Sequence, residues 1–203
     1  MPQTPNIAIL SSISEYFSMV VEDALRARKV SASTSASQYL VSVLTDYAHP
    51  DEQTEPTFGR PLAFQLRDAL EASGPTRFRR LRLLGDGVLY GVGFFGGHIE
   101  LRGVDRKYVV GVGVTAYDNA SAMLRGSTTG KPQHDVLLEL AQKFEQFVDV
   151  LSDVADGAIA QGAQGERGLV SLYERWLKTG SSRIAEELNA RGLVPTRGKA
   201  GLN

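Results

Sequence analysis

The stretch from Arg80 to Arg125 combines the densest apolar content of the chain with its densest glycine content. Its first half carries apolar residues at spacings of three or four, as along one face of a helix: Leu81, Leu84, Val88, Val92, Phe95 and Ile99. A second stripe with helical spacing follows: Tyr108, Val112, Ala116, Ala120 and Met123. Between the stripes stands Asp105, whose carboxylate can accept from the free amides of a helix's first turn. The pattern predicts two consecutive helices.

Glycine is the feature of this stretch that most restricts how these helices can pack. Each helical glycine costs roughly 1 kcal/mol relative to alanine, and the first helix would hold six: Gly85, Gly87, Gly91, Gly93, Gly96 and Gly97. Only close packing offsets such a loss, and small residues let a partner backbone approach. We therefore expect the pair at the buried centre of a bundle, with four aromatic residues in the core: Tyr90, Phe94, Phe95 and Tyr117.

A strand interpretation of the same stretch is the alternative. Gly91, Gly93 and Gly96 form GxGxxG, and Asp118 follows 22 residues after Gly96, as in a dinucleotide-binding motif. The helix in between would be only about ten residues long, and the surroundings read as helix rather than as alternating strands and helices. We expect no cofactor; a small-ligand or cofactor binder around Gly91, Gly93, Gly96 and His98 is the third functional hypothesis.

Two motifs in this stretch resemble those of a known group of proteins. The run LGDGVLYGVGFFGGHIELRGV followed by YVVGVGVTAY is similar to a motif in uncharacterised, all-helical bacterial proteins. YLVSVLTDYA at 39–48 and LYERWLKTG at 172–180 resemble the same group, so the resemblance covers most of 38–180. It implies a helical fold and carries no function.

The remaining chain adds further helices. Apolar periodicity predicts helices from Ser12 to about 29, over 37–48, from 61 to about 73 and over 133–159. Ser12 and Glu15 have the spacing of a capping box, so residues 1–10 are expected to be an arm. The glycine-rich segment 160–168 is a boundary, followed by two short helices over 169–177 and 181–190. The prediction is an all-α bundle of about six helices over 1–160, with a C-terminal helical hairpin over 166–203.

Composition excludes several classes of function. The 203 residues carry 22 basic and 23 acidic groups, a net charge of -1, which argues against a polyanionic partner for the whole chain. There is no cysteine, so disulfides, thiol catalysis and cysteine-ligated metals are excluded. The N-terminus lacks a signal-peptide pattern, and the longest uncharged central run, 13 residues from Gly87 to Ile99, is too short to span a bilayer. We expect a soluble, cytoplasmic protein.

Residue types that could carry catalysis or bind metal are scattered. His49, His98 and His134 are far apart and form no ligand spacing, and no serine has a local base. We therefore predict no catalytic and no metal site, which favours a non-enzymatic protein. Asp86 is the exception worth mutating, because apolar neighbours indicate that it is buried. A buried carboxylate needs a partner, and we expect an arginine such as Arg82 or Arg125.

The C-terminal segment SSRIAEELNARGLVPTRG resembles the helix–turn–helix region of large serine recombinases, which carries IA-x-x-LN-x-x-G-x-PT. The matching residues are Ile184, Ala185, Leu188, Asn189, Gly192, Pro195 and Thr196, with one extra position between the glycine and the proline. Residues 171–203 hold six basic and three acidic groups, which is compatible with phosphate contacts. A DNA-binding regulator is therefore the second functional hypothesis, with Arg183, Arg191, Arg197 and Lys199 as the contacts.

The first functional hypothesis is a protein–protein interaction or scaffolding protein that forms a homo-oligomer. The apolar stripe over 133–159 holds for more than three heptads and could either pack in the bundle or pair with a second copy. Tyr173 and Trp176 are expected to be exposed on a short terminal helix, where such rings serve as interface anchors, although docking into a core explains them equally well. Self-association through either feature is the predicted activity.

Overall fold

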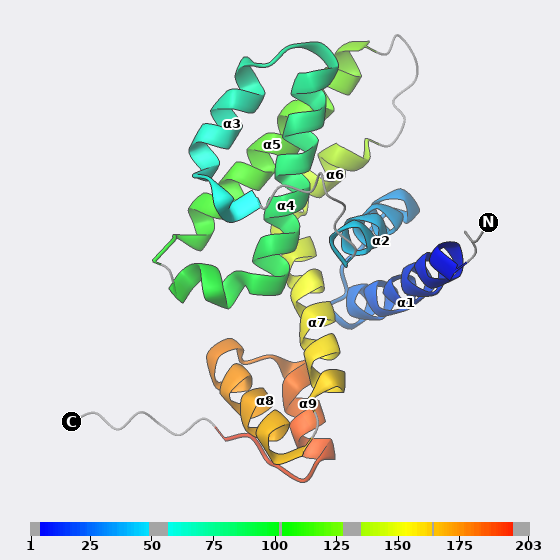
Figure 1. Cartoon of the computed structure of the whole chain (residues 1–203), viewed down its shortest axis with the longest axis vertical. Helices are drawn as coiled ribbons and strands as arrows, with labels where there is room; N and C mark the ends of the chain where they lie inside the picture. The colour runs from blue at the N-terminus through cyan, green and yellow to red at the C-terminus, as the bar shows by residue number, and fades with distance from the viewer. Residues whose placement is uncertain (1–4, 49–56, 102, 128–134, 164, 197–203) are drawn as a thin grey trace. The chain divides into compact units, whose positions relative to one another are not determined.

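The computed structural model describes residues 5–48, 57–101, 103–127, 135–163 and 165–196; the side chains of 5–12, 97, 98, 100, 101, 126, 127 and 166 lie outside this description. Within these ranges the chain forms helices and turns and no strand, which confirms the all-α prediction (Figure 1). Two compact units are present, residues 1–151 (unit 1) and 152–203 (unit 2). The predicted domain division at 160–166 stays a prediction.

The described helices follow one another along the chain as α1 (Pro5–Ala27), α2 (Thr34–Ala48), the short 3-10 helix η1 (Thr57–Gly59), α3 (Leu62–Glu71), α4 (Gly74–Leu101), α5 (Arg106–Ser127), α6 (Val136–Gln142), α7 (Phe144–Gly162), α8 (Gly165–Thr179) and α9 (Ser182–Ala190). These are nine α-helices, against about six in the bundle and two in the hairpin expected from the sequence. None of the helices in the described ranges offers a stretch long and apolar enough to cross a membrane.

The largest difference from the sequence expectation lies in the single helix predicted over 133–159. It is broken at Lys143, whose backbone (φ -110, ψ 21) separates α6 from α7. The Asp135 side chain starts α6 by accepting from the amides of Leu137 and Leu138, at 3.1 and 3.3 Å. The apolar stripe itself packs inside the protein: Leu137, Leu140, Phe144, Phe147, Val148, Leu151 and Val154 are all buried. The stripe is therefore part of the core.

The N-terminal helices also differ from their predicted bounds. α1 begins at Pro5, so the capping box at Ser12 is wrong and the arm expected over 1–10 is wrong for residues 5–10; residues 1–4 lie outside the described ranges. α2 begins at Thr34 rather than at residue 37, because the Ser33 hydroxyl accepts from the amide of Ala36 at 3.1 Å and caps the helix. The Asp105 cap on α5 is confirmed, since its carboxylate accepts from the amide of Lys107 at 2.9 Å.

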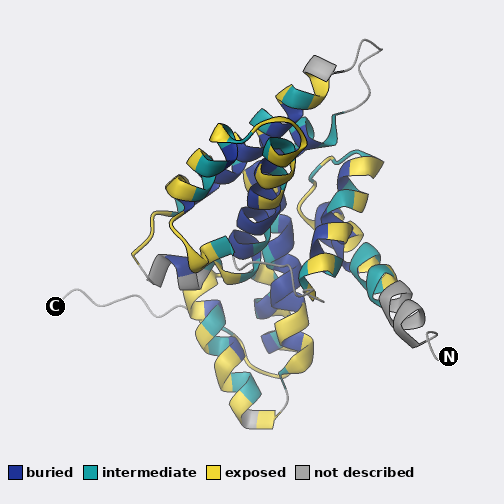
Figure 2. Ribbon diagram, turned by 45° about the horizontal axis from the view of Figure 1, so that its top comes forward, coloured by how far each residue is buried: buried dark blue, intermediate teal, exposed yellow. Residues whose placement is uncertain are grey.

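The α4–α5 pair is the centre of unit 1, as predicted. α4 packs against α5, α3, α2 and η1, and Figure 2 shows the buried residues running along the inner sides of these helices. The buried members of the two predicted stripes are Leu81, Leu84, Val88, Val92, Ile99, Val112, Ala116 and Ala120. Tyr117 is fully buried, but Phe95 and Tyr108 are 53% and 46% exposed, so their predicted core positions are wrong.

The glycines of α4 admit mainly side chains, and at Gly93 a neighbouring backbone also approaches, because a Cβ there would lie 3.4 Å from the Val148 carbonyl oxygen. A Cβ on Gly85 would lie 2.5 Å from the Tyr117 ring, and one on Gly93 would lie 2.6 Å from Leu151. Gly87 faces the side chain of Thr57, and Gly91 faces the ring of Phe58. Tight packing explains the glycine content as expected, but the fit is mainly of side chains into notches on the helix.

Unit 2 is built around its own small core. α8 and α9 are joined at Gly180, whose positive φ of 66° suits a residue without a Cβ, and the Ser181 hydroxyl caps α9 by accepting from the amide of Ile184. The buried residues are Ala160, Leu172, Trp176, Ile184 and Leu188. The two predicted helices are thus present: α8 is longer than the expected 169–177, and α9 is close to the expected 181–190.

Candidate functional site

Asp86 is a buried carboxyl group in the unit 1 core, and its hydrogen bonds join three helices. It lies on α4 and is 6% exposed. The hydroxyls of Tyr39 on α2 and Tyr117 on α5 both donate to the same carboxylate oxygen, at 2.6 and 2.8 Å. The sequence correctly predicted a buried Asp86 and a favourable charge from Arg82, but an arginine was also expected to bond the carboxylate. Two tyrosines donate instead; we call Asp86, Tyr39 and Tyr117 the Asp86 clasp.

The electrostatics of the clasp follow from burial. Removal from water raises the pKa of Asp86 to about 6, although the hydrogen bonds from Tyr39 and Tyr117 and the charge of Arg82 oppose the shift. Burial and the nearby carboxylate also raise the pKa of Tyr39 and of Tyr117, so both stay protonated and donate. The Asp86 carboxyl is thus shielded from water and accepts hydrogen bonds from two tyrosine hydroxyls that stay protonated.

A second contact between α2 and α4 lies one residue along from Asp86. The hydroxyls of Tyr47 and Thr57 meet over Gly87, where the helix has no side chain. Gln65 on α3 holds the η1 segment in place by donating to the carbonyl of Thr57 at 2.6 Å and to that of Arg60 at 3.0 Å. The absence of a side chain at Gly87 therefore leaves room on α4 for both hydroxyls.

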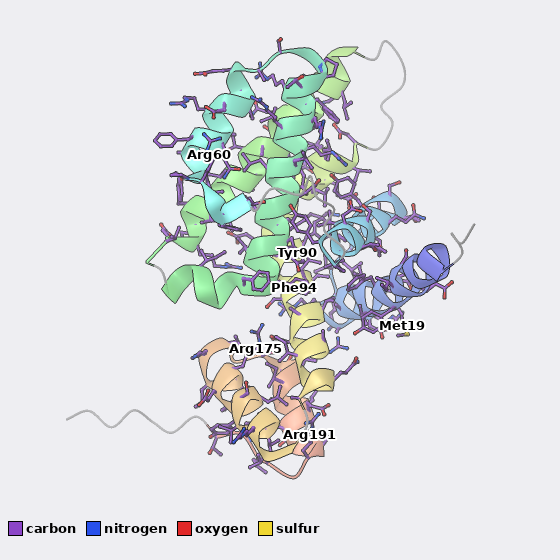
Figure 3. All side chains as sticks on the ribbon, in the orientation of Figure 1. Met19, Arg60, Tyr90, Phe94, Arg175 and Arg191 are labelled. Carbon is purple, nitrogen blue, oxygen red and sulfur yellow. The ribbon has the colours of Figure 1, made fainter. Side chains whose placement is uncertain are left out.

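A row of aromatic rings extends from Gly87 along α4. The Tyr47 ring stacks on Tyr90 with centroids 4.4 Å apart, and Tyr90 stacks on Phe94 at 4.7 Å. Phe95 meets Tyr90 edge-on at 5.8 Å, and Phe58 fills the notch at Gly91. Tyr90 and Phe94 follow each other one turn apart on α4 (Figure 3). We call Tyr47, Phe58, Tyr90, Phe94 and Phe95 the aromatic patch.

The aromatic patch reaches the protein surface beside a kink in α4. Phe95 leaves helical geometry (φ -124, ψ 18), and this break turns its ring out of the buried stripe to which its spacing assigned it. Phe95 is 53% exposed and Phe58 is 39% exposed, while Tyr47, Tyr90 and Phe94 are half-buried. The sequence placed Tyr90, Phe94 and Phe95 in the core; the structure places them at its edge.

The glycines proposed for cofactor binding do not form a phosphate-binding turn. Gly91, Gly93 and Gly96 all lie inside α4, so the strand-and-turn context of a dinucleotide motif is absent from this part of the described chain. Gly91 and Gly93 are covered by Phe58 and Leu151, and Gly96 faces open space. The side chain of His98 lies outside the described residues, as do His49 and His134.

The aromatic residues predicted as interface anchors belong to the core of unit 2. Trp176 is 8% exposed and packs with Leu172, Ile184 and Leu188. Tyr173 is half-buried against the same core and donates to the carbonyl of Thr196 at 3.2 Å. The predicted exposure of Trp176 is therefore wrong, and an interface role for the two rings stays a prediction.

The arginines proposed to contact DNA are engaged within unit 2. Arg191 donates to the carbonyl of Ala160 at 2.8 Å, to that of Ala163, and to the Glu187 carboxylate at 2.7 Å (Figure 3). The Arg183 guanidinium covers Gly157 of α7. Both side chains thus hold α9 against the end of α7. Arg197 and Lys199 lie outside the described residues.

Sequence reasoning missed three members of these sites. Tyr39 and Tyr47 lie inside the helix predicted over 37–48 but were given no role, and Phe58 falls between the helices predicted over 37–48 and from 61. The available signal was the glycine spacing: Gly87 and Gly91 are one turn apart, and each notch needs a side chain to fill it.

No family model matches the chain, and no curated protein and no solved structure matches it either.

Proposed function

We propose that this protein is a non-enzymatic interaction protein that self-associates through the aromatic patch of unit 1. The observation that carries the proposal is the outward turn of Phe95 at the kink of α4, beside the stacked rings of Tyr90 and Phe94. A phenylalanine that the helical repeat would have buried is held in contact with water.

Energetics support a contact surface at these rings. Aromatic side chains bury about 150–250 Å² each and dominate the binding energy of interfaces, where tyrosine is enriched among the residues that matter most. The stacking within the patch also fixes the rings before binding, which lowers the entropy lost when a partner arrives. A preformed aromatic surface is therefore suited to binding.

The chemistry of the patch favours a second copy of this chain as the partner. Its five residues bear no formal charge, so two copies related by a two-fold axis can bring ring against ring without like-charge repulsion. This interface would differ from the one expected from the sequence, because the apolar stripe over 133–159 is buried in the core and Trp176 is buried in unit 2.

Light scattering coupled to size exclusion, over a range of protein concentrations, tests the proposal. The informative variant is Phe95→Ser, and the matched control is Phe64→Ser. Phe64 on α3 is similarly exposed, at 50%, but it lies under the guanidinium of Arg67 rather than in the patch. We expect a discrete dimer whose dissociation constant rises by about tenfold or more in Phe95→Ser and is unchanged in Phe64→Ser.

Two results would overturn the proposal. One is a wild-type chain that stays monomeric over the whole concentration range. The other is an equal effect of the two substitutions, which would show that any exposed ring promotes association.

A further inference from the structure

The Asp86 clasp and the aromatic patch share two helices, α2 and α4. Tyr39 of α2 donates to Asp86, and Tyr47, about two turns later on α2, stacks on Tyr90 and places its hydroxyl over Gly87. The two contacts lie on neighbouring positions of α4. Any movement that separates Tyr39 from Asp86 therefore also disturbs the α2 side of the aromatic patch.

Tyr39 is the member of the clasp through which water can reach the carboxyl. Tyr117 is fully buried, whereas Tyr39 is only half-buried. α2 also buries Ala36, Leu40, Val41, Val43 and Leu44, so an open form with Tyr39 withdrawn is a minor population of the folded protein.

We propose that the Asp86 clasp is an acid-strengthened latch that holds α2 against α4, and that it thereby controls how completely the aromatic patch is formed. The proposal rests on the proposed function for the role of the patch. The latch itself stands on the three side chains alone.

The direction of the control follows from the groups that face Asp86. α2 presents the hydroxyls of Tyr39 and Tyr47 and the charge of Asp46, α4 presents Arg82, and α5 presents Tyr117. Arg82 favours the ionised carboxylate and Asp46 disfavours it, while burial, which disfavours it, is the largest influence and raises the pKa of Asp86 to about 6.

Linkage then fixes the sign. In the open form the bond from Tyr39, which lowers the pKa of Asp86, is lost, but water solvates the carboxylate. Because burial is the larger of the two influences, the pKa falls toward the ordinary value of 3.8. The closed form thus binds a proton more tightly than the open form, and acid favours closure. As the pH rises from about 4 to 7, the opening equilibrium of α2 is expected to increase on the order of tenfold.

Amide hydrogen exchange read by mass spectrometry tests the latch at pH 4.5 and pH 7, after correction for intrinsic exchange rates. The protein is kept dilute enough to be monomeric, so the readout does not depend on self-association. We expect the opening of α2 to increase on the order of tenfold at the higher pH, while peptides from α8 and α9 show no such change. An equal change in both places would overturn the proposal.

Asp86→Asn provides the decisive comparison, because an amide of the same shape accepts both tyrosine bonds but cannot ionise. We expect α2 opening in Asp86→Asn to lose its pH dependence. Asp149→Asn is the matched control: it removes a carboxylate from the surface of the same unit, where Asp149 is 49% exposed and pairs with Arg28 and Arg106. The control should keep the wild-type pH dependence.

Both variants keep the three histidines of the chain. A pH dependence that survives in Asp86→Asn would therefore assign the effect to another group and overturn the latch. Should Asp86→Asn fail to fold, the wild-type comparison of α2 with α8 and α9 still decides.

Light scattering at the two pH values separates the latch from the proposed function. We expect wild-type self-association to be stronger at pH 4.5 than at pH 7, and Asp86→Asn to be insensitive to pH. A chain that shows the α2 opening but stays monomeric keeps the latch and overturns the proposed function. A dimer whose affinity is the same at both pH values, although the α2 opening changes, overturns the coupling between latch and patch.

Discussion

Gly85 lies directly beneath the ring of Tyr117: a Cβ at position 85 would fall 2.5 Å from two of the ring atoms. The ring is thereby placed to donate its hydroxyl to Asp86 on the next residue of α4. Glycine at position 85 lowers the stability of the helix itself but makes room for the Tyr117 ring that the clasp requires.

Gly85→Ala is expected to destabilise the protein by roughly 1–3 kcal/mol, because the displaced Tyr117 ring is fully buried and cannot move aside freely. Gly111→Ala on α5 is the matched control, since nothing lies within 4 Å of its Cβ position. It should stabilise the protein by up to about 1 kcal/mol through helix propensity. Urea unfolding followed by circular dichroism measures both, and a gain in Gly85→Ala would contradict the account.

The same glycines show how far the sequence predicts the fold. Apolar spacing correctly located α4 and α5, and the cost of helical glycine correctly implied that they lie at a crowded centre. The nature of the crowding was not predictable, because Phe58 and Tyr47 reach α4 from segments distant in the chain. A local pattern records that a notch exists but not which side chain fills it.

Global stability should depend on pH through Asp86. Because the folded-state pKa is raised above the unfolded value, the stabilisation is full below about pH 4 and is lost as the pH rises to about 6. A shift from 3.8 to about 6 corresponds to about 3 kcal/mol. Unfolding free energies of wild type and Asp86→Asn, measured from pH 4 to 7, should therefore diverge as the pH rises, to the advantage of the variant. Parallel curves would show that Asp86 ionises without penalty.

Tyr117→Phe should weaken the clasp without changing the shape of the core. Loss of a buried hydrogen bond is expected to cost about 1–3 kcal/mol, and the pKa of Asp86 should rise further because a donor to its ionised form is gone. Tyr108→Phe on the same helix is the control, since its ring is 46% exposed. Carbon-13 NMR of the Asp86 carboxyl reads the pKa directly, and an unchanged value in Tyr117→Phe would count against the clasp.

Unit 2 should depend on one buried ion pair. Arg175 donates to the Asp156 carboxylate at 2.7 Å, and the Asp156 side chain is 2% exposed. Arg175→Ala leaves that carboxylate unpaired, which is expected to cost about 3–5 kcal/mol. Arg26→Ala, which breaks an exposed pair with Asp23, should cost less than about 1 kcal/mol. Hydrogen exchange of α8 and α9 measures the first cost and that of α1 measures the second. A loss of protection in α8 and α9 that is no larger than the loss in α1 would refute the difference.

The candidate surface was less predictable than the fold, for a physical reason at Phe95. Its spacing from Val92 and Ile99 marks it as a core residue, and periodicity assumes an unbroken helix. The kink at Phe95 breaks the repeat and turns the ring outward. In unit 2 the error has the opposite sign, since Trp176 was predicted to be exposed and is buried. Its ring packs in the small core that α8 forms with α9.

If two copies meet at the aromatic patch, pyrene labels beside Phe95 on the two chains come close enough to form an excimer. The chain has no cysteine, so Gly96→Cys gives a single labelling site, and its Cβ position has nothing within 4 Å. We expect excimer emission that grows with protein concentration and is absent when the label is carried by Ala122→Cys, an exposed position on α5. Monomer emission from Gly96→Cys at every concentration would show that the aromatic patch does not bring two copies together.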